Sequence, residues 1–538
     1  MHALRRIGEA IALFGCVHCA STAGQGGVAS GRGGEAAPAE KRLPSRLRRL
    51  SNAEYRATLS ALLASSVELP SSFPEDVRVE GFTSNARQGV DPTYLAEAQA
   101  LARSLAAGAA SERLREIVPC DAMAPGCARR WISAWAERAY RRALQAREVD
   151  AVLALFEREA ARGGFAAGVE LVLGTLLVSP ELLYINELGT EVSPGVSRLR
   201  SEDAASVLAY MFTGGPPDEP LLRAGIEGRL SSAEQRAEQA WRLLARSETR
   251  FQFRRFVREW LGLDPLESLT KPVPDDRQLR FGLLAETDAF VDEVFMYEGA
   301  SLDRLLLAGF TVIPASLRAF EGLPAAPTGE AYGRVSLAGS ARLGLLQQPS
   351  FLAVHSHEQE TAPVLRGKAI LERLLCVELP RPSELGLVVN FPLPDPRLTT
   401  RERHARHTED ATCRSCHRTI DALGNTFENF DFVGRQRQTE NQRPIDTRTD
   451  YDGPAGPQTF KDSRDVSRWL AASPRAHECF ARQAFRFFTG QTDPGVEAAF
   501  LRVRDELPED KRGDLFENLV AFAASPLFME RSLEERSQ

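Results

Sequence analysis

The stretch Cys413-Arg414-Ser415-Cys416-His417 carries the most specific chemistry in this chain. Its C-x-x-C-H spacing is the pattern of c-type haem attachment. Two thiols one helical turn apart can each bond to one vinyl group of a porphyrin, and the adjacent imidazole then lies under the iron as an axial ligand. With 8 Cys and 8 His among 538 residues, the pattern arises by chance only about 0.002 times. The sequence therefore predicts haem c at Cys413 and Cys416, with His417 as a ligand of the iron.

The same residues have an alternative interpretation as a disulfide loop or a zinc site with an incidental histidine. His407 could complete a zinc set with Cys413, Cys416 and His417. Adjacent residues such as Cys416 and His417 are, however, awkward joint ligands for one tetrahedral zinc ion. The spacing therefore favours haem over zinc.

A six-coordinate electron carrier needs a second axial ligand, which is commonly methionine. Met529 is the only methionine downstream of His417, and core packing is the alternative role for it. His355 and His357, upstream of the motif, are the other candidates for the distal ligand. An open iron site is the further alternative, and it would permit peroxide chemistry.

Three arginines near the motif are candidates for the haem propionates, because guanidinium binds carboxylate through two parallel hydrogen bonds. They are Arg366, Arg435 and Arg437. The alternative is a structural salt bridge from these arginines to Glu428 or Asp431. The sequence leaves both roles open.

The N-terminus predicts export. Two arginines precede a short apolar region, and Leu13-Phe14-Gly15-Cys16 resembles a bacterial lipobox. We therefore expect lipid on Cys16, with the Gly-, Ala- and Ser-rich residues that follow as a flexible tether. Simple cleavage near Ala20, or no export, are the alternatives. The expected location is periplasmic or on the outer membrane or cell surface, with a lipid anchor in the membrane.

Export fits the remaining cysteines. Cys120 and Cys127 flank a short loop and predict a local disulfide in an oxidising compartment. Cys376 and Cys479 either pair with each other or are buried thiols, and the sequence does not decide between these.

Bulk composition is that of a soluble globular protein, with 43% hydrophobic and 26% charged residues. A net charge of −7, with both signs mixed along the chain, argues against nucleic acid as a partner. No run of 18 apolar residues occurs beyond residue 40, so no membrane-spanning helix is expected there. No nucleophile motif or phosphate-binding loop is present.

Apolar periodicity predicts a mainly α, multidomain helical protein with a small cytochrome c-like segment near the C-terminus. Ser51-Asn52-Ala53-Glu54 is a capping box that opens the first helix. Val335-Ser336-Leu337 is one of few strand patterns. Further helices are expected over 93–107, 129–144, 148–160, 165–178, 201–212, 231–246, 249–262, 276–297, 363–375, 401–407, 463–472, 476–489, 493–506 and 512–524.

The expected domain organisation follows from these patterns and from the chain length. An N-terminal signal and tether precede four helical domains and one haem domain. The ranges are 1–40 for the signal and tether, 41–110 for an N-terminal helical domain, 111–192 for a helical domain with the Cys loop, 193–382 for a central helical domain, 383–452 for the haem domain and 453–538 for a C-terminal helical domain.

Several motifs together resemble a known family. They are Arg49-Leu50-Ser51-Asn52-Ala53-Glu54-Tyr55, Gly81-Phe82 with Asn85, Arg138-Ala139-Tyr140-Arg141-Arg142, Ser179-Pro180-Glu181-Leu182-Leu183-Tyr184, Trp260-Leu261-Gly262, Pro363-Val364-Leu365-Arg366-Gly367-Lys368, and Cys413 to His417 with Ile420-Asp421, Gly424, Glu428-Asn429-Phe430-Asp431 and Gly434-Arg435. The chain resembles exported proteins built from planctomycete-specific domains around a planctomycete cytochrome C-like domain, which are also abundant in myxobacteria. The resemblance implies an exported protein that carries haem, and it implies no particular reaction.

The function expected from the sequence is one-electron transfer through a covalent haem c, with an unknown redox partner. The first alternative is a haem enzyme, a peroxidase or oxidase with an open distal site, since a bare carrier needs no such large helical domains. The second alternative is a surface scaffold protein of unknown activity.

Overall fold

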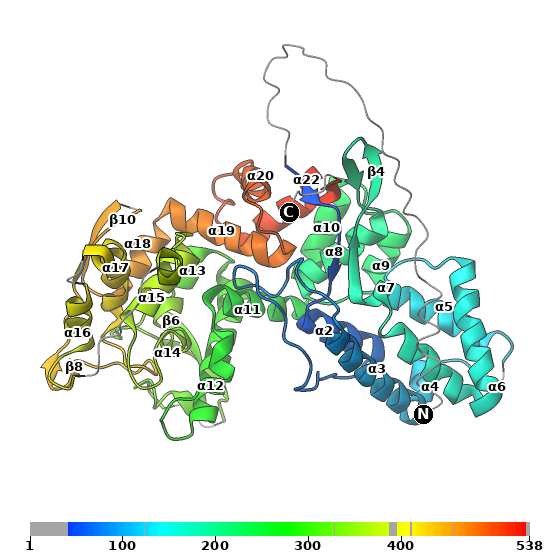
Figure 1. The fold of residues 1–538 in the computed structure, drawn as a ribbon, viewed down its shortest axis with the longest axis horizontal. Helices are drawn as coiled ribbons and strands as arrows, with labels where there is room; N and C mark the ends of the chain where they lie inside the picture. The colour runs from blue at the N-terminus through cyan, green and yellow to red at the C-terminus, as the bar shows by residue number, and fades with distance from the viewer. Residues whose placement is uncertain are drawn as a thin grey trace, which may run out of the picture. The chain divides into compact units, whose positions relative to one another are not determined.

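The computed structural model describes residues 41–122, 124–325, 327, 329–386, 395–408, 411–454 and 456–533. Helices dominate this part of the chain, as the sequence predicts (Figure 1). The chain divides into two compact units. Unit 1 contains Tyr55–Glu75 and Gly89–Ile185, and unit 2 contains Leu43–Glu54, Asp76–Gln88 and the chain from Asn186 onward.

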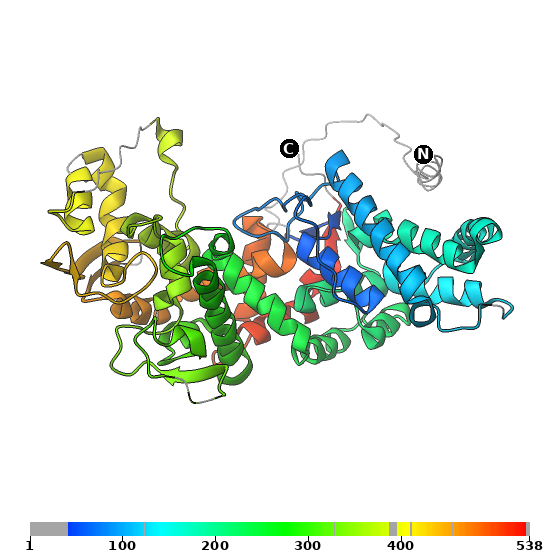
Figure 2. The same cartoon turned by 90° about the horizontal axis from the view of Figure 1, so that it is seen from below.

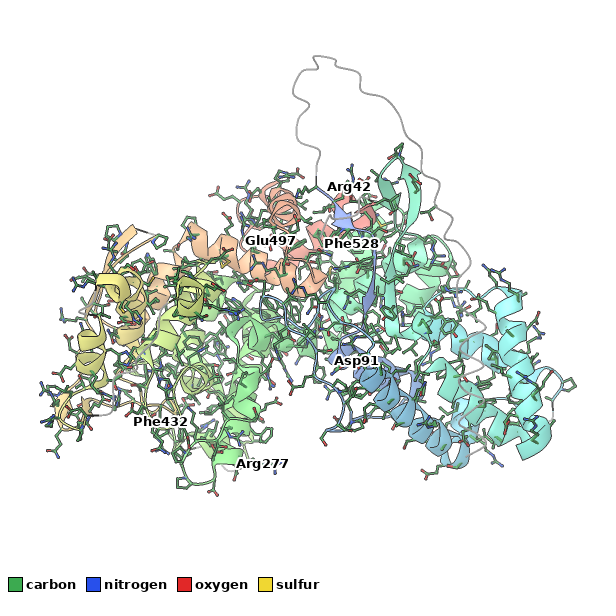
Figure 3. The ribbon with its side chains drawn as sticks, in the orientation of Figure 1. Arg42, Asp91, Arg277, Phe432, Glu497 and Phe528 are labelled. Atoms are coloured by element: carbon green, nitrogen blue, oxygen red, sulfur yellow. A yellow bond between two sulfur atoms is a disulfide. The ribbon has the colours of Figure 1, made fainter. Side chains whose placement is uncertain are left out.

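Unit 1 is helical, and its two long helices α3 and α6 pack along each other (Figure 2). Asp91, labelled in Figure 3, caps α3 by accepting a hydrogen bond from the Tyr94 backbone N–H at 2.7 Å. Gly164 interrupts α6 with non-helical dihedral angles, so that α6 corresponds to the two helices expected on either side of it. The helices are α2 (Asn52–Leu63, with its first residues in unit 2), α3 (Pro92–Glu112), α4 (Leu114–Ile117), α5 (Cys127–Tyr140), α6 (Ala146–Leu176) and α7 (Pro180–Leu183).

The predicted disulfide of unit 1 is present. Cys120 and Cys127 are joined at the start of α5, where Cys127 is buried. The bond fixes the chain that enters this helix, and the prediction from the cysteine spacing is confirmed.

Unit 2 is also mainly helical. Its α-helices are α8 (Ser201–Thr213), α9 (Glu219–Ile226), α10 (Ala233–Leu244), α11 (Ser247–Leu261), α12 (Asp276–Glu293), α13 (Leu302–Leu307), α14 (Pro349–Val354), α15 (Pro363–Ala369), α16 (Thr400–His407), α17 (Ala411–Gly424), α18 (Ser463–Ala471), α19 (Pro474–Thr489), α20 (Pro494–Asp505), α21 (Leu515–Ala524) and α22 (Pro526–Met529). Two of them continue into π-helical turns, α12 into η3 (Val294–Glu298) and α15 into η6 (Ile370–Leu374). Short 3₁₀ turns are η2 (Asp264–Glu267), η4 (Ala315–Leu317), η5 (Leu345–Gln347), η7 (Pro382–Leu385) and η8 (Asn425–Phe427).

The strands are short. They are β1 (Leu43–Pro44), β2 (Arg46–Arg49), β3 (Tyr184–Glu187), β4 (Thr190–Ser193), β5 (Val196–Arg198), β6 (Phe310–Pro314), β7 (Tyr332–Ser336), β8 (Thr439–Glu440), β9 (Arg443–Pro444), β10 (Thr449–Gly453), β11 (Gly456–Phe460) and β12 (Glu530–Ser532). A four-stranded sheet has the order β1-β12-β5-β4. In this sheet β12 lies parallel to β1 and antiparallel to β5. Antiparallel pairs join β6 to β7, β8 to β9 and β10 to β11. The strand expected near Val335 is β7.

The capping box at the start of α2 is confirmed. The Ser51 backbone N–H donates to Glu54 Oε2 at 2.8 Å, and the Glu54 N–H donates to Ser51 Oγ at 3.3 Å. Arg48 donates to both carboxylate oxygens of the same Glu54, at 2.8 and 3.0 Å. Buried hydrogen bonds among Arg48, Ser51 and Glu54 thus hold the start of α2.

Aromatic side chains fill the core of unit 2. Trp260 is fully buried, lies flat against Phe256 and contacts Phe480, with ring centroids 5.8 and 5.1 Å apart. Its indole Nε1–H donates to the Arg373 carbonyl at 2.7 Å. This bond ties α11 to η6 and so fixes the element that continues from α15.

A second disulfide, which the sequence left open, joins Cys376 to Cys479. It links the chain just after η6 to α19 across a sequence separation of 103 residues.

Within the described ranges, no helix has the length and apolar character needed to cross a bilayer.

Candidate functional site

The haem motif lies on helix α17. The expected helices do not include this range, and the structure corrects this, because Cys413, Cys416 and His417 all fall within a continuous α-helix. No proline interrupts Ala411–Gly424, and Ile420 and Leu423 give the helix a buried apolar face. The motif residues are therefore held at fixed helical spacing.

Helix α17 is held from behind by α15, and the two helices lie side by side (Figures 1 and 2). Both helices contribute a glycine to the contact. A Cβ atom on Gly367 would lie 1.9 Å from the Ile420 carbonyl oxygen, and one on Gly424 would lie 1.8 Å from the Pro363 carbonyl oxygen. The contact is therefore backbone to backbone, and only glycine fits at either position. The Gly367 and Gly424 motifs of the sequence are explained by this single crossing.

Arg366, on the buried side of α15, organises the turn that follows α17. Its side chain is 0% exposed, and it donates to the carbonyl oxygens of Phe427 and Asp431, both at 3.0 Å. It also donates to Ser356 Oγ at 2.9 Å. Burial lowers the pKa of Arg366 to about 10. The guanidinium thus adds a second donor to two carbonyl groups that also accept backbone hydrogen bonds, from the N–H groups of Phe430 and Gly434.

Glu428 collects two arginines and a threonine at the same turn. The Arg437 guanidinium lies 3.1 Å and the Arg366 guanidinium 3.5 Å from its carboxylate, and the Thr361 hydroxyl donates to it at 2.7 Å. Burial raises the pKa of Glu428 even though both arginines oppose that shift. For Arg366 and Arg437 the observed arrangement is the structural ion pair with Glu428, and a role toward haem propionates stays a prediction.

The thiols of the motif differ from every other described cysteine. Cys413 and Cys416 are partly exposed and neither takes part in a disulfide, although they lie one helical turn apart. Cys416 packs against the edge of the hydrophobic core. The remaining described cysteines are all joined in pairs, namely Cys120 with Cys127 and Cys376 with Cys479.

His417 is oriented by a carboxylate on its own helix. Its Nδ1 lies 3.1 Å from Asp421 Oδ1, one turn further along α17. The two side chains are 19% and 14% exposed, so the pair is only partly open to water. The sequence motif contains Asp421, but its contact with His417 becomes evident only once the helix is known.

The zinc alternative receives no support from the described residues. No group of three or more His, Cys, Asp or Glu side chains that could hold a metal ion is found among them. Cys413, Cys416 and His417 therefore do not converge as zinc ligands would. The side chain of His407 lies outside the described residues, as does Cys16.

The candidate distal histidines lie in the segment after α14. His355 is partly buried and its Nε2–H donates to the Leu261 carbonyl at 2.9 Å. Burial lowers the pKa of His355 to about 4, so the ring is neutral at physiological pH. His357 is exposed, and its backbone carbonyl accepts a hydrogen bond from Lys271 Nζ at 2.7 Å. A role of either histidine as iron ligand stays a prediction.

Two further candidates lie elsewhere. Met529 is 5% exposed and belongs to the hydrophobic core, which is the core role left open by the sequence. Arg435 is exposed, with its guanidinium 4.7 Å from the centre of the Phe320 ring. The neighbouring Phe432, labelled in Figure 3, has Lys271 Nζ 5.9 Å from its ring centre.

Four family models match the chain in order. They are PSD3, protein of unknown function (DUF1587), over 48–111, PSD5, protein of unknown function (DUF1595), over 127–187, PSD4, protein of unknown function (DUF1592), over 199–323, and PSCyt3, protein of unknown function (DUF1588), over 342–440. The chain therefore belongs to the multidomain proteins built from planctomycete-specific domains and a planctomycete cytochrome C-like domain. No curated protein and no solved structure matches it.

The cytochrome C-like match begins well before the haem motif and includes α15. Arg342, at the start of the matched range, donates to the Gly434 carbonyl near its end, at 2.7 Å. The α15 to α17 contact and the ion pairs on Glu428 lie within the same range. The segment that positions α17 thus extends N-terminal to residue 382.

Proposed function

We propose that this chain is an exported c-type haem protein that transfers single electrons. The observation that carries the proposal is that the two cysteines of the motif are not joined in a disulfide. Cys413 and Cys416 are outside disulfides in a protein whose other described cysteines are paired. They lie on one helix within the cytochrome C-like match, directly before a histidine held by a carboxylate.

The residues present fit this group. The Cys413 and Cys416 thiols would form the thioether bonds to the porphyrin, and His417 would coordinate the iron through Nε2. When bound, the haem supplies a one-electron iron couple whose potential depends on its ligand, on nearby charges and on burial. The backbone contact between α15 and α17 holds the helix that carries these three side chains. The protein would therefore need little rearrangement around the iron when the iron changes its charge.

The partial exposure of the site fits electron transfer better than it fits an enzyme reaction at a deeply buried haem. Cys413, Cys416 and His417 are all partly exposed. A haem attached to them would lie close to the surface, where a redox partner can approach. The paired cysteines and the set of matched domains point to export, which is also where c-type haem is attached.

The test of haem attachment is covalent retention after denaturation. Protein exported together with a c-type maturation system should keep its haem on a denaturing gel, and Cys413→Ala with Cys416→Ala should lose it. Cys120→Ala with Cys127→Ala removes two cysteines elsewhere and should keep the haem. Covalent haem in the Cys413/Cys416 double variant would contradict the proposal. The holo-protein should also be reduced and reoxidised reversibly by small one-electron mediators.

We further propose that lipid on Cys16 anchors the mature protein, with residues 17–40 as the tether. The lipobox-like sequence Leu13-Phe14-Gly15-Cys16 supports this. Labelling of growing cells with a fatty acid should mark the wild-type chain and leave Cys16→Ala unmarked. A mature chain that begins after Cys16 and carries no lipid would show simple secretion instead.

A further inference from the structure

Asp421 is not one of the residues that would bond to the haem, yet it contacts the histidine of the motif. It lies four residues after His417 on α17, where helical geometry places the two side chains on one face. Its Oδ1 is 3.1 Å from His417 Nδ1. Both side chains are less than one-fifth exposed, so water screens this contact less than it would screen a surface pair.

The contact selects one tautomer of the imidazole. A carboxylate can only accept a hydrogen bond, so His417 must donate from Nδ1. In the neutral ring the lone pair then lies on Nε2, which is the nitrogen that coordinates the iron in the proposed function. A carboxylate bound to the far nitrogen of a metal-ligating histidine also fixes the ring orientation and raises the basicity of the ligand.

We propose that Asp421 is a positioning residue that orients His417 for the iron and, through its negative charge, favours ferric over ferrous haem. The proposal deepens the proposed function and rests on it. A more basic ligand and a nearby anion both stabilise the more highly charged ferric iron, so this haem should have a lower reduction potential than one without Asp421.

The chain offers a matched control for charge. Asp452 lies on β10, and its carboxylate is 3.9 Å from the guanidinium of Arg418 on α17. The Asp452 side chain is 74% exposed. Asp452→Asn removes the same charge as Asp421→Asn from the surroundings of α17 without touching His417. Solvent screens an exposed charge strongly, so the two substitutions should differ in effect.

The orientation is tested on the full chain exported without haem maturation. The ¹⁵N signals of His417 report which ring nitrogen carries the proton. We expect the Nδ1–H tautomer in the wild type and in Asp421→Asn, whose amide oxygen can still accept, and the Nε2–H tautomer in Asp421→Ala. A wild-type ring protonated on Nε2, or an Asp421→Ala ring unchanged from the wild type, would overturn the positioning role.

The charge effect is tested on the haem-loaded chain by spectroelectrochemical titration. Asp421→Asn should shift the equilibrium between ferric and ferrous haem at least tenfold toward ferrous. This corresponds to a rise of about 59 mV in the reduction potential of a one-electron couple. Asp452→Asn should shift it less than threefold. Equal shifts in the two variants would overturn the proposal. A chain that takes up no haem would contradict the proposed function alone, because the tautomer measurement still decides whether Asp421 orients His417.

Discussion

At the scale of single residues, the cytochrome C-like segment depends on charges that are held away from water. Arg366 is fully buried and Glu428 is 1% exposed. Burial lowers the pKa of the first and raises that of the second, so removal of both groups from water opposes their mutual attraction. The contribution of Arg366 to stability therefore lies mainly in the carbonyl groups of the turn after α17, to which it donates.

Arg366→Met should destabilise unit 2 strongly. The substitution removes hydrogen bonds to the Phe427 and Asp431 carbonyls and leaves Glu428 with one arginine instead of two. Breaking a buried pair by removing one partner costs about 3–5 kcal/mol. Urea denaturation of the purified chain measures this change in the free energy of unfolding. Arg435→Met is the matched control, since Arg435 is exposed and its contact with Phe320 is worth about 1 kcal/mol or less; equal losses would contradict the argument.

Local spacing could predict some of these residues, and long-range contacts decide the others. The haem motif and the Cys120 to Cys127 disulfide follow from short intervals in the sequence. The burial of Arg366 depends on carbonyl groups more than 60 positions further along the chain. The sequence therefore made Arg366 a candidate near the motif, but it could not separate a structural role from a propionate contact.

At the scale of elements, the crossing of α15 and α17 is the feature that positions the motif. Gly424→Ala places a methyl group 1.8 Å from the Pro363 carbonyl oxygen, so the two helices must move apart. Overpacking of this kind costs about 1–3 kcal/mol and occasionally more, and here no flexible side chain can yield. We expect a loss of about 3 kcal/mol in chemical denaturation, with haem incorporation lowered in the maturation assay.

Gly513→Ala is the control for this substitution. An added Cβ at Gly513 meets no atom within 4 Å, so its effect on the free energy of unfolding should stay within about 0.5 kcal/mol. Equal stability of Gly424→Ala and wild type would show that the α15 to α17 contact is looser than the structure has it.

A buried pair of carboxyl groups lies where α12 meets the β6 to β7 hairpin. Glu286 is 1% exposed and accepts a hydrogen bond from the Thr311 hydroxyl at 2.6 Å. Burial, together with the neighbouring Glu321 carboxyl, raises the pKa of Glu286 well above its ordinary value. Arg342 approaches Glu321 at 3.4 Å and opposes the shift only in part.

This pair makes stability depend on pH with a definite sign. Because the pKa of Glu286 is higher in the folded than in the unfolded chain, its contribution is fully present below the unfolded value and is lost as pH rises through the folded value. Glu286→Gln should therefore raise the free energy of unfolding at pH 8 relative to wild type and flatten its fall between pH 5 and pH 8. Glu293→Gln, on the same helix but in a surface pair with Arg334, should leave that slope unchanged; a steeper slope in Glu286→Gln would contradict the assignment.

Helix positions could largely be predicted from apolar periodicity and caps. The capping box at Ser51 appears where the sequence places it, and the interruption at Gly164 falls between the two helices expected over 148–160 and 165–178. The attachment segment is the exception, because polar and cysteine residues hide the helical pattern of α17 until its buried face against α15 is known. The four-stranded sheet could not be predicted, since its strands are two to four residues long and come from distant parts of the chain.

At the scale of the whole molecule, each compact unit contains its own disulfide. Cys120 and Cys127 close a short loop in unit 1, with a sequence separation of 7. Cys376 and Cys479 close a long one in unit 2, with a separation of 103. The sequence could predict the first because spacing alone brings the cysteines together, whereas the second depends on the packing of α19 against η6.

The two bonds should differ in what they contribute. On the loop-entropy model, a cross-link stabilises by constraining the unfolded chain, by about 2.5 kcal/mol for the short loop and about 4.7 kcal/mol for the long one. Cys376→Ala with Cys479→Ala should therefore lower the free energy of unfolding of unit 2 by roughly 2 kcal/mol more than Cys120→Ala with Cys127→Ala lowers that of unit 1. Each loss is measured at its own unfolding transition by calorimetry. Both double variants leave Cys413 and Cys416 in place, so haem uptake reports whether the segment around α17 still folds. If the long-loop variant loses no more stability than the short-loop variant, the loop-entropy argument is wrong for this bond. The unfolded chain would then keep the segments of α19 and η6 close together even without the disulfide.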